Sequence, residues 1–159
     1  AKGFFAQFEQ QFFPGFLGND YDFKRTSIDF RYYQRMWKGA ILASQVQGIF
    51  NYGDTPWSMV ALMGGAYSMR GYYEGRNRDN DLIQFQVEYR QKIYIRHGMV
   101  VWGGAGNVFP DMDKFKWKQT LPTYGIGYRW EFKNRVNVRL DYGFGKGVSA
   151  FYFGINEAF

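Results

Sequence analysis

The chain has no cysteine, one histidine and four prolines among its 159 residues, and no apolar run reaches the roughly 18 residues of a membrane-spanning helix. Without cysteine, disulfides and thiolate metal sites are excluded. His97 has no serine near it in the sequence, so there is no sign of a nucleophile activated by a histidine base. With a single histidine, a transition-metal centre is also disfavoured. We therefore expect no enzyme, no cofactor and no metal site.

Aromatic residues, in contrast, make up 22% of the chain, and glycine is frequent with 20 residues. Tyrosine and tryptophan suit the two water–lipid interfaces of a membrane. The net charge is +6, but the cations are dispersed along the sequence rather than clustered. That dispersal argues against nucleic-acid binding and leaves attraction to anionic lipid headgroups as the milder interpretation.

Apolar and polar residues alternate through every segment of strand length. From Leu121 onward, one parity carries Tyr124, Ile126, Tyr128, Trp130 and Phe132, and the other carries Thr123, Gly125, Gly127, Arg129 and Glu131. The last segment repeats the pattern with Phe151, Phe153, Ile155 and Phe159 on one parity. A membrane barrel turns such aromatic faces to lipid and encloses the charged ones. A soluble ligand-binding barrel would need an apolar interior, which the charged parity does not offer.

The pattern predicts an all-β protein, an antiparallel transmembrane β-barrel of about eight strands forming one domain over residues 1–159. The expected strands are residues 2–13, 22–36, 40–52, 81–93, 99–109, 120–132, 135–144 and 147–159. Mostly short turns on one side and long loops on the other are typical of outer-membrane barrels, with the short turns periplasmic. We therefore expect both termini in the periplasm of a bacterial outer membrane.

Strand parity also predicts which side chains face the lumen. The inward set contains charges of both signs: Glu9, Arg25, Asp29, Arg31, Arg35, Glu88, Arg90, Arg129, Glu131, Arg135, Arg139 and Asp141, with Gln45, Gln47, Gln84 and Gln86. The outward set, including Phe4, Phe8, Val46, Phe85 and Leu140, carries no charge. A charge at the bilayer midplane costs about 2–4 kcal/mol, so its absence from this set supports the membrane interpretation.

The connection over residues 53–80 is much longer than the others, and its centre is too apolar to extend into water. It contains Gly64-Gly65 and then Arg70-Gly71-Tyr72, which resembles the sixth-loop motif of the BamA-type superfamily of outer-membrane proteins. That superfamily includes TamA and the two-partner secretion transporters. The resemblance implies that the loop folds into the barrel and that Arg70 contacts acidic residues of the inner wall.

Further segments resemble the superfamily in the same order along the chain. They are Val87-Glu88-Tyr89-Arg90, Trp102 to Val108, Tyr124 to Trp130, Leu140-Asp141-Tyr142-Gly143 and Phe153 to Phe159. The resemblance implies lumen partners Glu88, Arg90, Arg129 and Asp141, and a C-terminal sorting signal comprising Phe153, Ile155 and Phe159. Gly104 stands where the superfamily has an aspartate, so we expect Glu88 to carry more of the pairing with Arg70.

The resemblance covers only the C-terminal half of the superfamily's barrel, and we expect no POTRA domain. It implies a role in assembly or translocation of outer-membrane proteins, with other such proteins as clients. The alternative is a small structural or lipid-organising barrel without transport, in which Arg70 is a latch alone. Eight strands enclose little space, and open strand edges are prohibitive in lipid. We therefore expect outer-membrane lipids as partners and either a homo-oligomer or pairing with other barrel strands.

Overall fold

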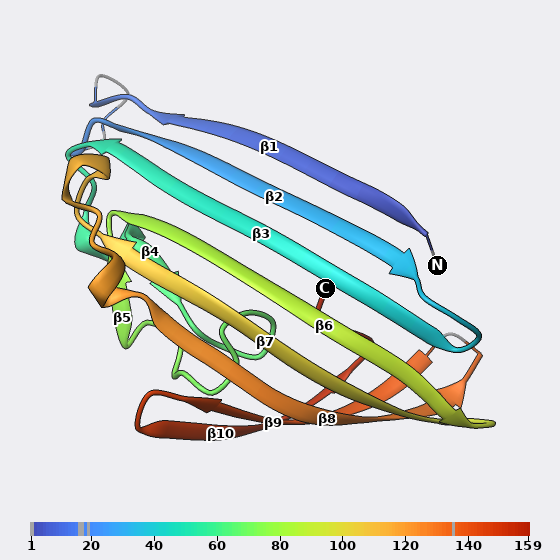
Figure 1. Ribbon diagram of the computed structural model, residues 1–159. Helices are drawn as coiled ribbons and strands as arrows, with labels where there is room; N and C mark the ends of the chain where they lie inside the picture. Colours follow the sequence, from blue (N-terminus) through green and yellow to red (C-terminus); the bar gives the residue numbers. More distant parts are fainter. Residues whose placement is uncertain (1, 16–17, 19, 135) are drawn as a thin grey trace.

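The fold is one large antiparallel sheet, seen in a computed structural model that describes residues 2–15, 18, 20–134 and 136–159. The expected inward position of Arg135 lies outside the described residues. The sheet order is β1-β2-β3-β6-β7-β8-β9-β10 (Figure 1). Its strands are β1 Gly3–Phe13, β2 Phe23–Arg35, β3 Ala40–Gly53, β6 Asp81–Tyr94, β7 His97–Phe109, β8 Leu121–Lys133, β9 Val136–Gly145 and β10 Val148–Ile155. These bounds confirm the expected strands closely, except at the end of the last one.

The smaller elements all lie at the end of the sheet with long loops. β4 (Ala61–Met63) and β5 (Asn77–Asp79) form a two-stranded sheet within the long loop, after the 3-10 turn η2 (Trp57–Met59). Two further turns, η3 (Met112–Lys114) and η4 (Trp117–Gln119), lie between β7 and β8. No helix among the described residues has the length and apolar character needed to cross a membrane.

The sheet curves strongly but does not close. Among the described residues, β1 pairs only with β2 and β10 only with β9, and Figure 1 shows them as opposite edges of the curved sheet. The predicted all-β antiparallel sheet is confirmed, while the closed barrel stays a prediction. A closed barrel of eight strands would leave too little room inside for the long loop. In the open sheet the loop has room, because it lies against the concave face.

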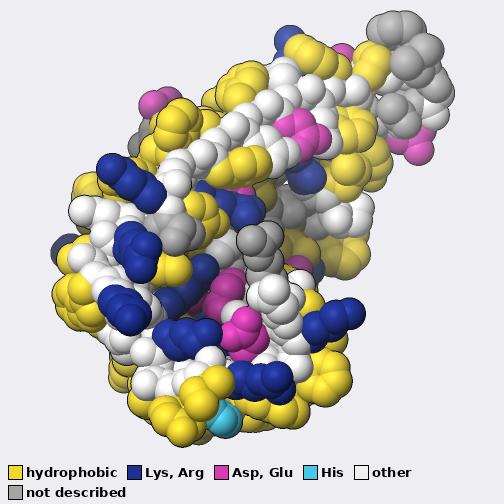
Figure 2. Space-filling model, turned by 90° about the vertical axis from the view of Figure 1, so that its right-hand side faces the viewer, with side chains coloured by type: hydrophobic (Ala, Val, Ile, Leu, Met, Phe, Trp, Pro, Cys, Tyr) yellow, Lys and Arg dark blue, Asp and Glu magenta, His cyan; other side chains and the backbone are white. Residues whose placement is uncertain are grey.

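The two faces of the sheet separate apolar from charged side chains as predicted. Phe4, Phe8 and Phe153 on the convex face are 75%, 69% and 67% exposed. On the concave face, Glu88 and Asp141 are fully buried. Figure 2 shows acidic and basic side chains inside the hollow and apolar ones around its outside. The apolar face therefore points outward and the charged face inward, as in a membrane barrel and opposite to a soluble sandwich.

The end of the chain departs from the predicted strand. β10 ends at Ile155, and Asn156 adopts a positive φ of 67°, a conformation that asparagine tolerates better than most residues. This turn redirects the chain, so Phe159 is buried in the hollow against Ala43 and Ala158. The expectation that Phe159 shares the outward face of Phe153 and Ile155 is therefore wrong.

We predict that Val46→Arg, in the middle of the outward face of β3, costs about 2–4 kcal/mol of folding free energy in lipid. The matched change Ile95→Arg, at a short turn, should cost about 0–1 kcal/mol because it lies near the interface. Both side chains are exposed, at 42% and 67%. Urea unfolding in vesicles measures the two costs, and equal costs would contradict the assignment of the convex face to lipid.

Candidate functional site

The long loop returns onto the concave face of the sheet through an apolar contact. Met63, Met69, Tyr72 and Ala61 are buried with Leu82 of β6. Partly buried Ile49, Val108, Leu121 and Val148, from four strands of the large sheet, pack around this cluster. The apolar centre of the loop is thus covered, as its composition required.

Arg70 lies at the centre of this contact, with no exposed surface. Its Nη1 lies 2.8 Å from Asp141 Oδ2 of β9, and its Nη2 lies 2.5 Å from Glu88 Oε2 of β6. Both carboxylate side chains are also fully buried. The Arg70 guanidinium lies 3.7 Å from the centroid of the Trp102 ring, which adds a cation–π contact from β7. One side chain of the loop therefore binds three strands of the wall.

Glycine at two positions allows the loop backbone to approach β9 directly. Gly71 has a φ of 109°, and a Cβ there would lie 2.8 Å from the carbonyl carbon of Phe144. A Cβ at Gly143 would lie 2.7 Å from the carbonyl carbon of Arg70. Any side chain at either position would push the loop away from the strand. The glycine of the Arg-Gly-Tyr motif is thus required by close packing and by its backbone conformation.

Tyr72, the third residue of the motif, fixes the loop by its hydroxyl group. Its Oη donates to the carbonyl of Pro122 at 2.7 Å and accepts from the Lys146 backbone N–H at 2.7 Å. Its ring lies directly over Gly145, where any Cβ would overlap it. The hydroxyl of Thr123 also donates to the carbonyl of Arg70. The motif is therefore bound to both β8 and the β9–β10 turn.

The edge strand β10 joins the same contact through Tyr152. Its hydroxyl accepts from the Gly71 backbone N–H at 2.9 Å and donates to the Tyr72 carbonyl at 3.3 Å. Tyr152 was not among the predicted site residues. Its parity within the last strand, opposite to that of Phe151 and Phe153, is the signal in the sequence that places it inward.

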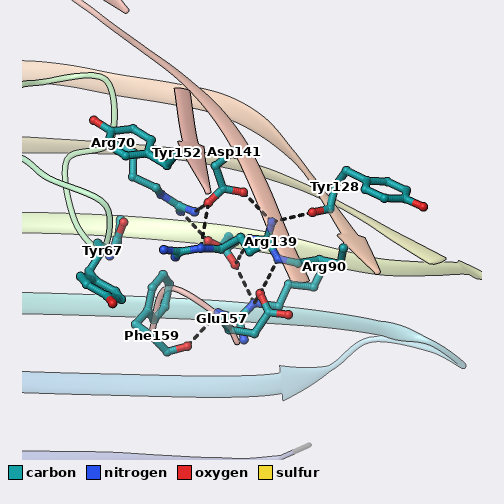
Figure 3. A network of polar contacts seen from close by, with 12 residues as sticks. Tyr67, Arg70, Arg90, Tyr128, Arg139, Asp141, Tyr152, Glu157 and Phe159 are labelled. Atoms are coloured by element: carbon teal, nitrogen blue, oxygen red, sulfur yellow. Dashed lines mark hydrogen bonds and ion pairs between the residues drawn. The ribbon is translucent and has the colours of Figure 1, made fainter. Parts of the chain in front are cut away.

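A second set of ion pairs surrounds the Arg70 contact (Figure 3). Arg129 Nη1 lies 2.5 Å from Asp141 Oδ1, and Arg90 Nε lies 2.7 Å from Glu88 Oε1. Each buried carboxylate is therefore shared between Arg70 and a strand arginine. Arg139, 1% exposed, lies more loosely beside Asp141, at 3.7 Å. The four residues predicted as lumen partners, Glu88, Arg90, Arg129 and Asp141, lie together in this network.

The residues after β10 also bind the arginines of this network. Glu157 Oε2 lies 2.7 Å from Arg129 Nε, and its Oε1 accepts from Asn137 Nδ2 at 3.0 Å. Arg90 Nη2 donates to the Phe159 carbonyl oxygen at 2.8 Å, and its guanidinium lies 5.2 Å from the Phe159 ring centroid. Figure 3 shows Glu157 and Phe159 pointing toward the arginines. Glu157 was missed because straight-strand parity points it outward.

Gly104 offers no carboxylate, and Arg70 pairs instead with Glu88 and Asp141, which were both predicted as lumen partners. One expectation about this site changes with the geometry. Phe153 and Ile155 face outward, at 67% and 62% exposed, whereas Phe159 contacts Arg90. The residues expected as one sorting signal are thus divided between the two faces.

The network holds the loop against the wall through ion pairs from several strands. Its members are guanidinium and carboxylate groups bound to one another, and no group of three or more metal-ligand side chains occurs among the described residues. Fully buried ion pairs fix geometry more reliably than they add stability. We name this set of ion-paired residues the Arg70 latch: Arg70, Glu88, Arg90, Arg129 and Asp141.

A curved antiparallel sheet with an apolar convex face, a charged hollow and a loop latched inside it defines an outer-membrane type of β protein. The sequence model of a protein family, described as the Omp85 superfamily domain, matches residues 1–159. The chain belongs to the Omp85 superfamily, which confirms the resemblance. The superfamily is one of outer-membrane protein assembly and translocation. No curated protein matches the chain.

We predict that Arg70→Met lowers the free energy of unfolding by about 3–5 kcal/mol, because it leaves Glu88 and Asp141 buried beside fewer cations. Arg31→Met is the matched control, since Arg31 pairs with Asp29 on the same face but is 30% exposed. That change should cost about 0–1 kcal/mol. Urea titration of the protein in detergent micelles measures both losses. Similar losses for the two variants would contradict the interpretation of Arg70 as the residue that holds the loop.

We also predict that Gly71→Ala releases the loop without removing any charge. The added Cβ would strain the backbone at φ 109° and press on Phe144, at a cost of about 1–3 kcal/mol. Gly103→Ala is the control, because a Cβ there meets nothing closer than 4.0 Å. Trypsin should cleave after Arg70 faster in Gly71→Ala only. Unchanged cleavage would mean that the loop does not depend on this close approach.

Proposed function

We propose that the protein is an integral outer-membrane subunit that takes part in the assembly or translocation of other outer-membrane proteins. The observation that carries this proposal is the open sheet, in which β1 and β10 are each paired on one side only within the described residues. Superfamily membership supports the same role at a coarse level. No catalytic step is part of the proposal.

The open edges are the reason for expecting strand partners. In the hydrocarbon layer, each unpaired backbone N–H or C=O group costs several kcal/mol, so edges of this length must be paired. The partners that fit are strands: those of a second copy, those of another barrel segment, or a strand of a client protein. Main-chain pairing accepts many sequences, because the hydrogen bonds come from the backbone. Such tolerance suits a protein that handles varied clients.

The long loop and the Arg70 latch are both connected to one of these edges. Tyr152 of β10 binds the backbone of Gly71 and Tyr72, and Glu157 beyond β10 binds Arg129. A change in the position of β10 would therefore disturb the latch, and loss of the latch would remove contacts that hold β10 and the tail beyond it. This coupling favours a role for the loop in controlling the edge, beyond fixing the inner wall.

The connections support a particular orientation in the membrane. Short turns join β2 to β3, β6 to β7 and β8 to β9 at one end, where β1 also begins (Figure 1). In outer-membrane barrels, short turns face the periplasm. We therefore place both termini on the periplasmic side and the latched loop at the outer side.

The alternative function is a structural or lipid-organising protein without transport. It is favoured by one observation: the loop covers the hollow and buries its ionic groups completely at Glu88 and Asp141. A passage through such a packed centre requires release of the latch. In that alternative, the open edges pair permanently with a second copy or with other barrel strands.

We predict that vesicles carrying the protein accelerate insertion of an eight-stranded outer-membrane barrel diluted from urea, relative to matched protein-free vesicles. The chain lacks cysteine, so single cysteines report which strand meets the client. Ala6→Cys in β1 or Ser149→Cys in β10 should form disulfides with a client that carries one cysteine in its last strand. Val101→Cys, exposed in the central strand β7, is the control.

Each result discriminates between the proposals. Acceleration together with disulfides from an edge strand supports assembly activity. Disulfide-linked dimers of Ala6→Cys or Ser149→Cys without acceleration would support the structural alternative. Equal cross-linking from Val101→Cys would show that the edges have no special role, which would overturn the proposal.

A further inference from the structure

Five lysines and arginines from separate parts of the sequence lie together at one end of the sheet. Arg35 and Lys38 flank the β2–β3 turn, Lys92 and Arg96 lie at the β6–β7 turn, and Lys133 ends β8. All five side chains are exposed. Figure 2, which views this end, shows basic side chains around the mouth of the hollow. We name these five residues the basic rim.

The basic rim is poorly neutralised. Glu131 binds Lys92 Nζ at 2.9 Å, and Glu157, which lies in the same part of the hollow, binds Arg129. Lys38, Arg96 and Lys133 make no ion pair with a carboxylate of the described residues. The opposite end differs, because its lysines stand among aspartates: Asp111 and Asp113 accompany Lys114, Lys116 and Lys118. The five cations of the rim together with Glu131 carry a net charge of +4, which is most of the +6 of the whole chain.

An apolar and aromatic belt borders the basic rim on the convex side. Trp37, Tyr94 and Ile95 at the same turns are 56%, 66% and 67% exposed, and Phe132 beside Lys133 is 62% exposed. Exposed tryptophan and tyrosine at the end of membrane strands mark the depth of the lipid headgroups. Cations just beyond such a belt lie at the depth of the phosphate groups of the lipids. A nucleic acid would not approach a basic surface bordered by side chains immersed in lipid.

We propose that the basic rim is a binding surface for anionic phospholipid headgroups, of the phosphatidylglycerol type, in the leaflet at the short-turn end. Each lysine or arginine close to an anionic membrane surface strengthens association roughly fivefold. Arg35, Lys38, Arg96 and Lys133 belong to three different turns, so lipids would line the outside of the curved sheet rather than fill a single pocket. This surface is separate from the Arg70 latch and does not depend on the assembly role.

The test compares lipid selectivity in reconstituted bilayers by electron spin resonance of spin-labelled lipids. The full-length protein should retain labelled phosphatidylglycerol at its surface in preference to phosphatidylcholine. In the triple variant Lys38→Gln, Arg96→Gln, Lys133→Gln, this preference should fall by at least half. The matched variant Lys114→Gln, Lys116→Gln, Lys118→Gln removes the same charge from the other end and should retain it. Heat-modifiable gel mobility verifies that both variants fold.

Salt provides an independent check, because 1 M NaCl shortens the screening length to about 3 Å and should abolish the preference. The proposal is overturned if the unaltered protein associates equally with the two lipids, in which case an acidic protein segment becomes the better partner for the rim. It is also overturned if the two triple variants lose the preference equally. Neither of these results bears on insertion of a client barrel, so failure here is distinguishable from failure of the assembly role.

Discussion

The burial of one guanidinium group, that of Arg70, organises the concave side of this protein. An isolated charge in that position would be prohibitive, so carboxylates must meet it there. Glu88 and Asp141 do so from β6 and β9, which are separated by β7 and β8 in the sheet. The hollow must therefore curve enough to bring these two strands to one side chain. The same requirement explains the nearby glycines, because the loop backbone reaches its partners only by touching the backbone of β9.

The carboxylates of the latch also connect Arg70 to the end of the chain. Asp141 is shared by Arg70 and Arg129, and Arg129 in turn binds Glu157. Glu88 is shared by Arg70 and Arg90, and Arg90 in turn binds the Phe159 carbonyl. The loop, the wall and the tail are thus connected through shared charged groups rather than through separate contacts. Removing one member leaves others buried without compensation, so the response is expected to be cooperative.

Local alternation was sufficient to predict the strands, because a residue such as Tyr128 or Arg129 shows its face by parity alone. The pairing of Arg70 with Glu88 followed from resemblance to a known loop motif, since no local pattern connects residues that far apart. Phe159 was misplaced and Glu157 was missed because parity assumes a straight strand, whereas the chain turns at Asn156. The contact of Trp102 with Arg70 depends on how far the sheet curves, and curvature leaves no local trace in the sequence. The same is true of the basic rim, whose members are adjacent only after the turns meet.

The contrast between the centre of the sheet and its edges bears on function. In the centre, both carboxylates of the latch are paired with arginines of the same chain, and the loop contacts strands from β6 to β10. At β1 and β10, one side of each strand has no partner among the described residues, and the backbone groups there must bind something in a lipid environment. A protein with a fixed interior and unsatisfied edges gains most free energy by pairing its edges. Tyr152 makes this pairing sensitive to the interior, because its hydroxyl joins edge strand β10 to Gly71 and Tyr72. On the proposed function, the loop and the edge would act together, because these Tyr152 contacts connect strand pairing at the edge with the position of the loop at the centre.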